Sequence, residues 1–469
     1  MKKLHTFRRG IHPKEMKELT NKCPITDAFP ASKTVTIPVT MGGAPNAPLV
    51  QVGDEVARGQ KIASGDKFMN CPVHASVAGK IKKIGNCIVT GNQEVPCIVI
   101  EADGSDRTDF MEPIDPFACD TKDVLDRIRD AGIVGMGGAS FPAHVKLNPP
   151  ADKEIDYVLV NAAECEPYIT CDERTMQETP EKLIDGLAII LHITGARGVI
   201  ALEDNKEYIK PLLEEEINKK GYGDDMSVCL VKTKYPQGSE KFIVKSCLGI
   251  EIPSAKLPAD AGCIISNVGT VCAISDACRL GMPLIDRALT ISGGAVKNPC
   301  NIRVPVGTLI SDLMPSVFDL KEGEAVKCVS GGPMMGFAMA TTAFPVAKGT
   351  SGVTFLTEKE TYLLDEDPCI SCGACAHTCA MMLAPVMILR SLKAGDIDGA
   401  KRFGLMDCIE CGCCAYVCPS HIRIVQRVRL GKGIVRAKMA EDRIKADLAK
   451  KKAEAEAAEK AEAKPKEAK

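Results

Sequence analysis

Residues 369–380 read CISCGACAHTCA, and residues 408–419 read CIECGCCAYVCP. Each stretch places four cysteines so that two, two and three residues separate them. This spacing is typical of bacterial 4Fe–4S ligand runs, in which three thiolates wrap one cube and the fourth reaches a second cube. The pattern therefore predicts two 4Fe–4S clusters and a domain built around them.

The interleaved ligand rule distributes the cysteines over two cubes. One cluster is expected to take Cys369, Cys372, Cys375 and Cys418, and the other Cys408, Cys411, Cys414 and Cys379. Cys413 lies outside the ligand register and is expected to be a spectator. Zinc would use the same thiols, but two complete copies of a cluster spacing favour iron and sulfur. Apolar residues at helical spacing between the two runs predict that residues 359–432 form a helical domain.

The chain has 469 residues, which is long enough for three or four domains. Its 59 Lys and Arg residues balance 61 Asp and Glu residues, so charge gives no general attraction to nucleic acid. The 23 cysteines follow an N-terminus without an apolar leader, which predicts a reducing compartment. No stretch of the sequence predicts a membrane span, so membrane association is expected to depend on partner subunits.

The hydrophobic pattern changes along the chain and predicts a multidomain α/β protein. Residues 1–30 are polar and irregular, and short β-branched runs over residues 31–103 predict a small all-β module. Over residues 104–285, helical periods alternate with buried strands, which predicts a mainly parallel α/β domain. Residues 286–358 return to short strands and glycine turns. Residues 433–469 are almost entirely Ala, Lys and Glu, which predicts a solvated, fluctuating helix or a disordered extension.

A glycine-rich turn lies early in the predicted α/β domain, where residues 135–142 read GMGGASFP. Gly135, Gly137 and Gly138 allow backbone N–H groups to approach a phosphate or a flavin edge, and Lys146 can neutralise charge. Such a turn by itself is also compatible with a purely structural role. The clusters need a partner that supplies or takes electron pairs, and this turn is a candidate for binding that cofactor.

Residues 157–167 read YVLVNAAECEP, a buried strand followed by polar side chains. Asn161, Glu164 and Glu166 come at or after the carboxyl end of the strand, where open α/β sheets bind ligands. The competing interpretation is a solvated acidic loop. We take these three residues as candidates for cofactor binding.

These two segments resemble the flavin-binding loop and the strand-end segment of the NADH-binding flavoprotein subunit of respiratory complex I. YPQGSEK at residues 235–241 and SNVGT at residues 266–270 are similar to two further elements of that site, and residues 290–313 resemble its β-grasp module. GIHPKEMK at residues 10–17 and PVHASVAGK at residues 72–80 narrow the resemblance to the RnfC family, the C subunits of Rnf ion-translocating electron-transport complexes. Members of that family carry a barrel-sandwich module ahead of the flavin domain.

The resemblance implies contacts to FMN and to NADH. The FMN contacts it implies are Gly135, Gly137, Gly138, Lys146, Asn161, Asn267 and Thr270. It implies NADH contacts from Phe141, Glu166 and Glu240, with the two carboxylates in catalytic roles. Ala163 and Gly269 stand where the complex I pattern has Asp and Glu, so the detailed flavin and nicotinamide geometry is expected to differ.

The resemblance also implies the identity of the modules. Residues 31–103 are expected to be a barrel-sandwich hybrid, residues 104–285 an FMN/NADH domain, residues 286–358 a β-grasp module, and residues 359–432 a dicluster ferredoxin domain. Barrel-sandwich hybrids are similar to biotinyl and lipoyl carriers. The residues around Lys67 do not repeat a carrier hairpin, so we expect this lysine to be unmodified.

The function implied is that of the NAD-side subunit of a membrane-bound ferredoxin:NAD oxidoreductase coupled to ion translocation. The chain is then expected on the cytoplasmic face of the membrane, peripheral, with integral-membrane and ferredoxin-like subunits as partners and ferredoxin reached indirectly. One alternative is a soluble cobalamin reductase flavoprotein of diol metabolism, which shares the flavin, β-grasp and two-cluster organisation. Another is a non-enzymatic dicluster electron relay. The Gly-Ile-His-Pro segment favours the Rnf interpretation, and the flavin motifs disfavour a bare relay.

Overall fold

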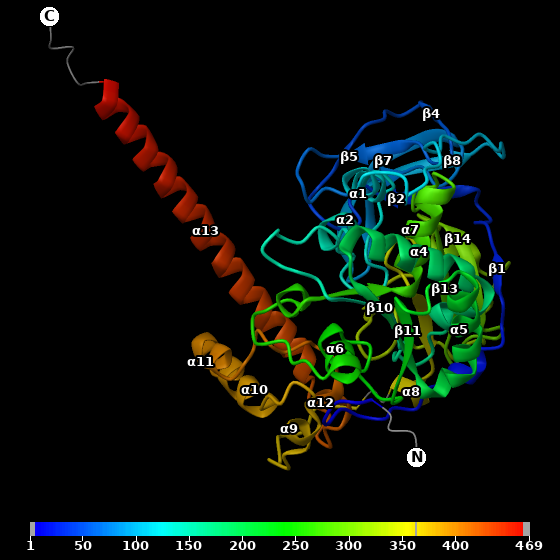
Figure 1. Cartoon of the computed structure of the whole chain (residues 1–469). Coiled ribbons are helices and arrows are strands. Elements are labelled where there is room, and N and C mark those ends of the chain that lie inside the picture. Colours follow the sequence, from blue (N-terminus) through cyan, green and yellow to red (C-terminus); the bar gives the residue numbers. More distant parts are fainter. Residues whose placement is uncertain (1–4, 362–363, 463–469) are drawn as a thin grey trace, which may run out of the picture. The chain divides into compact units, whose positions relative to one another are not determined.

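A computed structural model describes residues 5–361 and 364–462 of the chain (Figure 1). The chain divides into two compact units, the first ending at residue 363 and the second beginning at residue 364. The short helix α8 (Glu358–Thr361) still belongs to the first unit. Its Glu360 carboxylate accepts hydrogen bonds from the Tyr168 hydroxyl at 2.7 Å and the Gly294 N–H at 3.2 Å.

The first module of this unit is a pair of small antiparallel sheets. The larger sheet has the order β2-β8-β7-β4 and the smaller one β3-β5-β6. Alternate residues of β2, such as Val35 and Ile37, are fully buried against Ile98 and Ile100 of β8, as the β-branched pattern predicts. The strands are β2 (Thr34–Pro38), β3 (Ala47–Pro48), β4 (Glu55–Val56), β5 (Lys61–Ser64), β6 (Val73–His74), β7 (Gly79–Val89) and β8 (Gln93–Ala102).

A four-stranded sheet with the order β11-β10-β9-β12 follows, and every pairing in it is parallel. The parallel α/β prediction is therefore confirmed. The strands are β9 (Tyr157–Ala162), β10 (Arg197–Glu203), β11 (Met226–Val231) and β12 (Cys263–Asn267). The helices are α1 (Thr121–Asp130), α2 (Ala143–Lys146), α3 (Cys171–Glu178), α4 (Pro180–Thr194), η2 (Asp204–Ile209), α5 (Lys210–Lys219), α6 (Glu240–Leu248), η3 (Pro258–Ala261) and α7 (Val268–Arg279).

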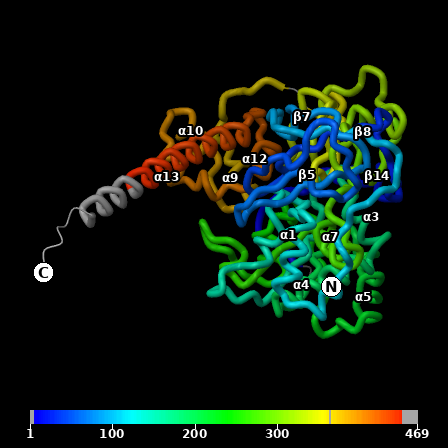
Figure 2. The backbone as a smooth tube through the Cα atoms, turned by 90° about the horizontal axis from the view of Figure 1, so that it is seen from above, coloured from blue at the N-terminus to red at the C-terminus, as the bar shows by residue number. Residues whose placement is uncertain are grey.

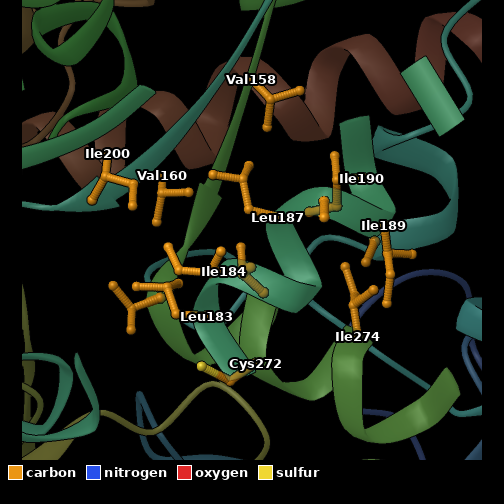
Figure 3. Close-up of a cluster of buried hydrophobic side chains, with 14 of the residues drawn as sticks. Val158, Val160, Leu183, Ile184, Leu187, Ile189, Ile190, Ile200, Cys272 and Ile274 are labelled. Carbon is orange, nitrogen blue, oxygen red and sulfur yellow. The ribbon is translucent and has the colours of Figure 1, made fainter. Parts of the chain in front are cut away.

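Helices cover both faces of the parallel sheet. On one face, Val158 and Val160 of β9 pack against Leu187 of α4 and Ile274 of α7 (Figure 3). On the other face, Leu159 packs with Ile243 and other residues of α6. Burial on both faces explains why β9 reads as a continuous apolar run. It also leaves the carboxyl ends of the strands as the edge where polar side chains emerge.

A six-stranded sheet, with the order β1-β14-β13-β17-β15-β16, completes the first unit. Its strands are β1 (Ile25–Asp27), β13 (Asp286–Ser292), β14 (Cys300–Pro305), β15 (Lys327–Ser330), β16 (Phe337–Met339) and β17 (Gly352–Leu356), and two short 3₁₀ helices are η1 (Lys17–Leu19) and η4 (Ile310–Leu313). The irregular N-terminal segment predicted for residues 1–30 is thus wrong in part, because β1 pairs in parallel with β14. This edge strand is mostly exposed and has no apolar alternation that could reveal it.

A buried lysine joins the three modules of the first unit. Lys348, which precedes β17, donates from Nζ to the carbonyl of Pro72, before β6, at 2.8 Å. It donates also to the carbonyl of Gly132, after α1, at 2.6 Å. The ammonium lies in the interior and binds groups from other modules. The three modules consequently share one polar contact that no single module could provide.

The second unit is helical, as predicted. Its helices are α9 (Ala374–Thr378), α10 (Pro385–Lys393), α11 (Ile397–Arg402), α12 (Cys413–Tyr416) and α13 (Ile424–Glu462). Figure 2 shows α10 beside the first half of α13, and Ile388, Leu389, Ile424 and Val428 form the core between them. α13 continues to Glu462, so the tail is helical up to that residue, and the part of the tail prediction that covers residues 463–469 lies outside the described residues. Within the described ranges, no helix combines the length and the apolar character needed to span a membrane.

Candidate functional site

The carboxyl edge of the parallel sheet brings together residues that lie far apart in the sequence. Asn161 on β9 and Asn267 on β12 are direct register partners. The Asn267 side chain caps α7 by accepting the Gly269 N–H at 2.9 Å. Thr270, in the first turn of the same helix, accepts the N–H of Met136 at 2.9 Å. This bond ties the glycine loop to the strand ends, so the predicted cofactor-binding segments meet at one edge.

The glycine loop is tight on one side and open on the other. The N–H of Gly135 donates to the Phe141 carbonyl at 2.9 Å, which closes the loop. A Cβ added to Gly137 would lie 3.2 Å from the Asn267 side chain, whereas one added to Gly138 would meet no atom within 4 Å. Phe141 is 43% exposed. The loop therefore offers an open backbone beside an exposed aromatic ring, which fits a planar, anionic cofactor.

Lys146 and Glu240 form an ion pair, with Nζ and Oε1 2.5 Å apart. Lys146 ends α2, and Glu240 begins α6. Both side chains are partly exposed, so a bound anion could replace Glu240 as the ion-pair partner of Lys146. The structure thus places the proposed phosphate-side lysine and one proposed NADH carboxylate against each other.

Glu164 is turned into the protein. Its carboxylate accepts the N–H of Asp172 at 2.7 Å and the N–H of Glu173 at 3.2 Å, both in the first turn of α3. Burial raises its pKa to about 8, although the charge of Lys17 opposes this shift. Glu164 therefore holds the N-terminus of α3 and helps to shape the loop.

Glu166 bridges two modules. Its carboxylate accepts the N–H of Met335 at 2.8 Å and that of Met334 at 3.2 Å, on the turn before β16. A Cβ added to Gly332 would lie only 2.3 Å from Oε2, so glycine permits this approach. Burial raises the pKa of Glu166 to about 7, whereas the two N–H donors lower it. The Glu166 carboxyl group is therefore partly protonated near neutral pH.

Sequence reasoning missed several residues of this site. Lys17, from the N-terminal segment, is buried and donates to the carbonyls of Glu164, Glu166 and Ile169 at 2.7, 3.2 and 2.5 Å. Asp172 accepts the side-chain amide of Asn267 at 2.6 Å. The GIHPKEMK motif contains Lys17, and it was the one feature of the sequence that drew attention to this segment. Nothing in that motif shows which loop the lysine reaches.

Arg287 of β13 lies behind the glycine loop. Its Nη2 approaches the carbonyl of Met136 at 3.5 Å, and a Cβ added to Gly269 would lie 3.0 Å from its Nη1. Its Nε is buried and has no hydrogen-bond partner among the described residues. This guanidinium therefore places one positive charge behind the loop.

The Asn161 side chain forms a hydrogen bond with a residue that was not among the predicted cofactor-binding residues. Its amide donates to the carbonyl of Gly238 at 2.8 Å, and the N–H of Gly238 in turn approaches Sγ of Cys165 at 3.1 Å. Burial raises the pKa of this thiol above its usual range. A neutral thiol is a poor nucleophile, so Cys165 is suited to packing rather than to chemistry.

The cysteines of the second unit gather in two groups. Burial raises the pKa of Cys375, and the nearby thiols of Cys372 and Cys418 raise it further. Burial likewise raises the pKa of Cys408 to about 11, with Cys411 and Cys379 adding to the effect. Cys379 is thus close to Cys408, and Cys418 is close to Cys375.

A hollow in the second unit is lined by Cys379, Cys408, Cys411 and Cys414, with apolar residues of α10 and α13 around them. Four thiols converging on one hollow suit the soft thiolate ligation of an iron–sulfur cluster. Cys413 is buried and lies beside Cys411, whose thiol raises its pKa.

Three family models match the chain. The Nuo51 FMN-binding domain matches residues 128–276, the RnfC barrel sandwich hybrid domain matches residues 5–105, and the 4Fe–4S dicluster domain matches residues 361–419. With the strand-end site and the paired cysteine sets, these matches define the class of protein as an iron–sulfur flavoprotein.

The relatives identify the family. The C subunit of the proton-translocating ferredoxin:NAD(+) oxidoreductase complex of Clostridium ljungdahlii is 45% identical, over 92% of this chain and 95% of that protein. The C subunit of the Na(+)-translocating ferredoxin:NAD(+) oxidoreductase complex of Acetobacterium woodii is 39% identical, over 91% of this chain and 96% of that protein. The chain belongs to the RnfC family, the C subunits of ion-translocating oxidoreductase complexes.

Among solved structures, an NAD+-reducing [NiFe]-hydrogenase in the H2-reduced state aligns with 68% of this chain and 62% of that chain. Its sequence identity is 19%, and the TM-score is 0.48.

Proposed function

We propose that this chain is the NAD-side subunit of a ferredoxin:NAD+ oxidoreductase complex that couples electron transfer to ion translocation. The main support is that the models of an FMN-binding domain and of a 4Fe–4S dicluster domain both match this one chain. A flavin exchanges electron pairs with a nicotinamide and single electrons with iron–sulfur clusters, which is the chemistry that this combination serves. The cobalamin reductase and bare relay alternatives have no comparable support.

The modules have separate tasks in this proposal. Residues 104–285 hold FMN and NADH, and residues 359–432 hold the two 4Fe–4S clusters. The barrel-sandwich hybrid at residues 31–103 and the β-grasp module at residues 286–358 frame the flavin domain. The Lys348 contacts between modules and the Glu166 contacts to the turn before β16 support a framing role. Residues 433–469 form an extension without an assigned task.

The residues of the strand edge divide by the group that they hold. The proposed FMN contacts are Gly135, Gly137, Gly138, Lys146, Asn161, Asn267 and Thr270. Phe141, Glu166 and Glu240 are proposed to hold NADH, and Glu164 to keep α3 and the loop in place. The bonds between the loop and Thr270, and the open backbone at Gly138, support this division.

The proposal places the chain on the cytoplasmic face of the membrane as a peripheral subunit. Its partners there are integral-membrane and ferredoxin-like subunits, and electrons from ferredoxin reach it indirectly. The support is that its relatives are named as subunits of ion-translocating complexes.

The test uses Glu166→Gln in the full-length protein. The glycine loop, Lys146 and Asn161 are untouched, so we expect the variant to retain FMN. NADH oxidation should fall by about one order of magnitude or more, because a misplaced hydride donor loses its orientation advantage. The measurement is NADH-to-ferricyanide turnover beside flavin content, with dithionite reduction of both clusters expected to be unchanged.

Glu154→Gln serves as the control, because Glu154 is an exposed glutamate of the same domain. Full turnover in a flavin-loaded Glu166→Gln protein would exclude Glu166 from the nicotinamide site. Loss of the flavin as well would assign the residue to flavin support instead.

A further inference from the structure

The second unit contains an internal repeat that extends beyond the cysteines. α10 begins six residues after Cys379, and α13 begins six residues after Cys418. An arginine lies eleven residues and a lysine fourteen residues after each of these cysteines. The first copy has Arg390 and Lys393, and the second has Arg429 and Lys432. The two halves therefore present matched cations, one pair beside each cysteine run.

The matched lysines have different surroundings. Lys393, at the end of α10, is exposed, whereas Lys432 is only 5% exposed. Lys432 donates from Nζ to the carbonyl oxygen of Cys408 and forms an ion pair with Glu410 at 2.9 Å. The second half thus holds a buried ammonium directly against the backbone of a proposed cluster ligand.

The residue immediately before the second cysteine of each run accounts for this difference. Glu410 stands in the second run where the first has Ser371, and both residues have a positive φ. Arg390 donates to the Ser371 hydroxyl at 3.2 Å, whereas Arg429 and Lys432 both bind the Glu410 carboxylate. Lys432 thus reaches the backbone of Cys408 while it also meets the Glu410 carboxylate.

The two halves also differ in solvent exposure. Cys369 and Cys372 are exposed, whereas Cys408 and Cys414 are partly buried. Reduction of a 4Fe–4S cluster adds one negative charge, which an interior of low dielectric constant disfavours. A fixed cation in the same interior favours the reduced form, because its field is weakly screened. The buried ammonium therefore opposes the penalty that burial imposes on this cluster alone.

We propose that Lys432 is a positioning and charge-compensating residue that raises the reduction potential of the cluster bound by Cys408, Cys411, Cys414 and Cys379. This inference rests on the proposed function and its ligand assignment. Lys393 has no such effect on the other cluster, because water screens its charge. The two halves of the repeat thus share the positions of their cations but differ in the electrostatic effect of those cations on the nearby cluster.

The experiment is a redox titration of the full-length, anaerobically reconstituted protein, followed by electron paramagnetic resonance. Lys432→Met should lower the midpoint potential of one cluster and leave the other unchanged. Lys393→Met, the matched control, should shift neither, and Lys432→Arg should restore most of the loss. Repeating the titration in a Cys372→Ala background, which keeps only the cluster at Cys408, identifies the cluster that shifts.

Glu410→Gln provides a variant with the opposite sign. Removing this carboxylate takes one negative charge away from the neighbourhood of Lys432 and Cys408, so the same midpoint potential should rise. If the Lys432→Met protein loses this cluster, the direction in which Glu410→Gln shifts the midpoint potential decides whether the inference holds. No shift in either variant, or equal shifts in both clusters, overturns the inference while the wild-type protein still contains both clusters. A wild-type protein with one cluster or none would instead contradict the proposed function.

Discussion

Glu164 and Glu166 stand two residues apart on one loop, but they serve different neighbours. Glu164 faces the first turn of α3, and Glu166 faces the turn before β16. Both are buried carboxyls with a raised pKa. At this scale the site is a set of short polar contacts that fix the loop after β9 from two sides.

The raised pKa of Glu166 predicts a dependence of stability on pH. An unfolded glutamate releases its proton near pH 4.5, whereas the folded group does so at about 7. Between these values the folded state binds more protons, so the free energy of unfolding contributed by Glu166 falls as pH rises. Glu166→Gln should reduce this slope by up to about 1.4 kcal/mol per pH unit. Urea unfolding at several pH values between about 5 and 7.5 measures it, and an unchanged slope would contradict the assignment.

Lys17 predicts a large effect from a single residue. Lys17→Met removes the donor for three carbonyls and the cation 3.9 Å from the Glu164 carboxylate. We expect the free energy of unfolding to fall by about 3–5 kcal/mol, as for other broken buried charge contacts, and the flavin to be retained poorly. Lys14→Met is the control, since Lys14 is exposed. Thermal unfolding and flavin content measure the two effects, and equal behaviour of both variants would refute the role.

The sequence predicted which residues lie at the strand edge, but it did not predict the hydrogen-bond partners of those residues. Asn161, Asn267 and Thr270 meet because strand-end positions converge in any parallel sheet. The contact from Lys17 to Glu164 spans 147 residues, and no local pattern encodes a contact of that kind. The Glu166 bonds depend on a glycine turn in another module, so their acceptor could be predicted but not their donor.

At the scale of elements, the packing of α4 against α7 fixes the position of the helix that begins at the carboxyl edge of the parallel sheet. A Cβ added to Gly186 of α4 would lie 2.0 Å from the carbonyl oxygen of Val271 in α7. The two helices therefore touch through their backbones at this point. α7 carries Thr270 and begins beside Asn267, so its position determines the position of the site.

Gly186→Ala should push these helices apart. The expected loss is about 1–3 kcal/mol of unfolding free energy, the usual effect of overpacking a core. Gly433→Ala is the matched control, because Gly433 also lies in a helix but its added Cβ would meet no atom within 4 Å. That variant should gain up to about 1 kcal/mol from helix propensity. Chemical denaturation distinguishes the two, and a stabilised Gly186→Ala protein would show that the contact yields easily.

Long, periodic elements were predictable and marginal ones were not. β9 is covered on both faces, and its apolar run identified it. β1 has three residues, pairs through its backbone and exposes most of its side chains, so its sequence carries no burial signal. For α13, composition left a helix and a disordered extension equally open beyond residue 433, because few apolar residues require a partner there.

At the scale of the whole molecule, the flavin-type edge and the cysteine sets belong to different compact units. Cys372→Ala should therefore reduce iron from about eight to about four atoms per chain while NADH-to-ferricyanide turnover at the flavin is retained. Cys413→Ala should keep all the iron, because Cys413 is outside the proposed ligand sets. Iron analysis beside the turnover assay tests both. Loss of a cluster in Cys413→Ala would show that the ligand register is displaced.

The pairing of β1 with β14 has a consequence for biosynthesis. Ile25 pairs with Asn301, so the partner strand of β1 is synthesised long after β1 itself. At translation rates of roughly 5 to 20 residues per second, this interval is on the order of tens of seconds. An early strand of this sheet thus depends on a much later strand for its backbone pairing. A nascent chain released before β14 would leave the edge of β1 open to pairing with other chains.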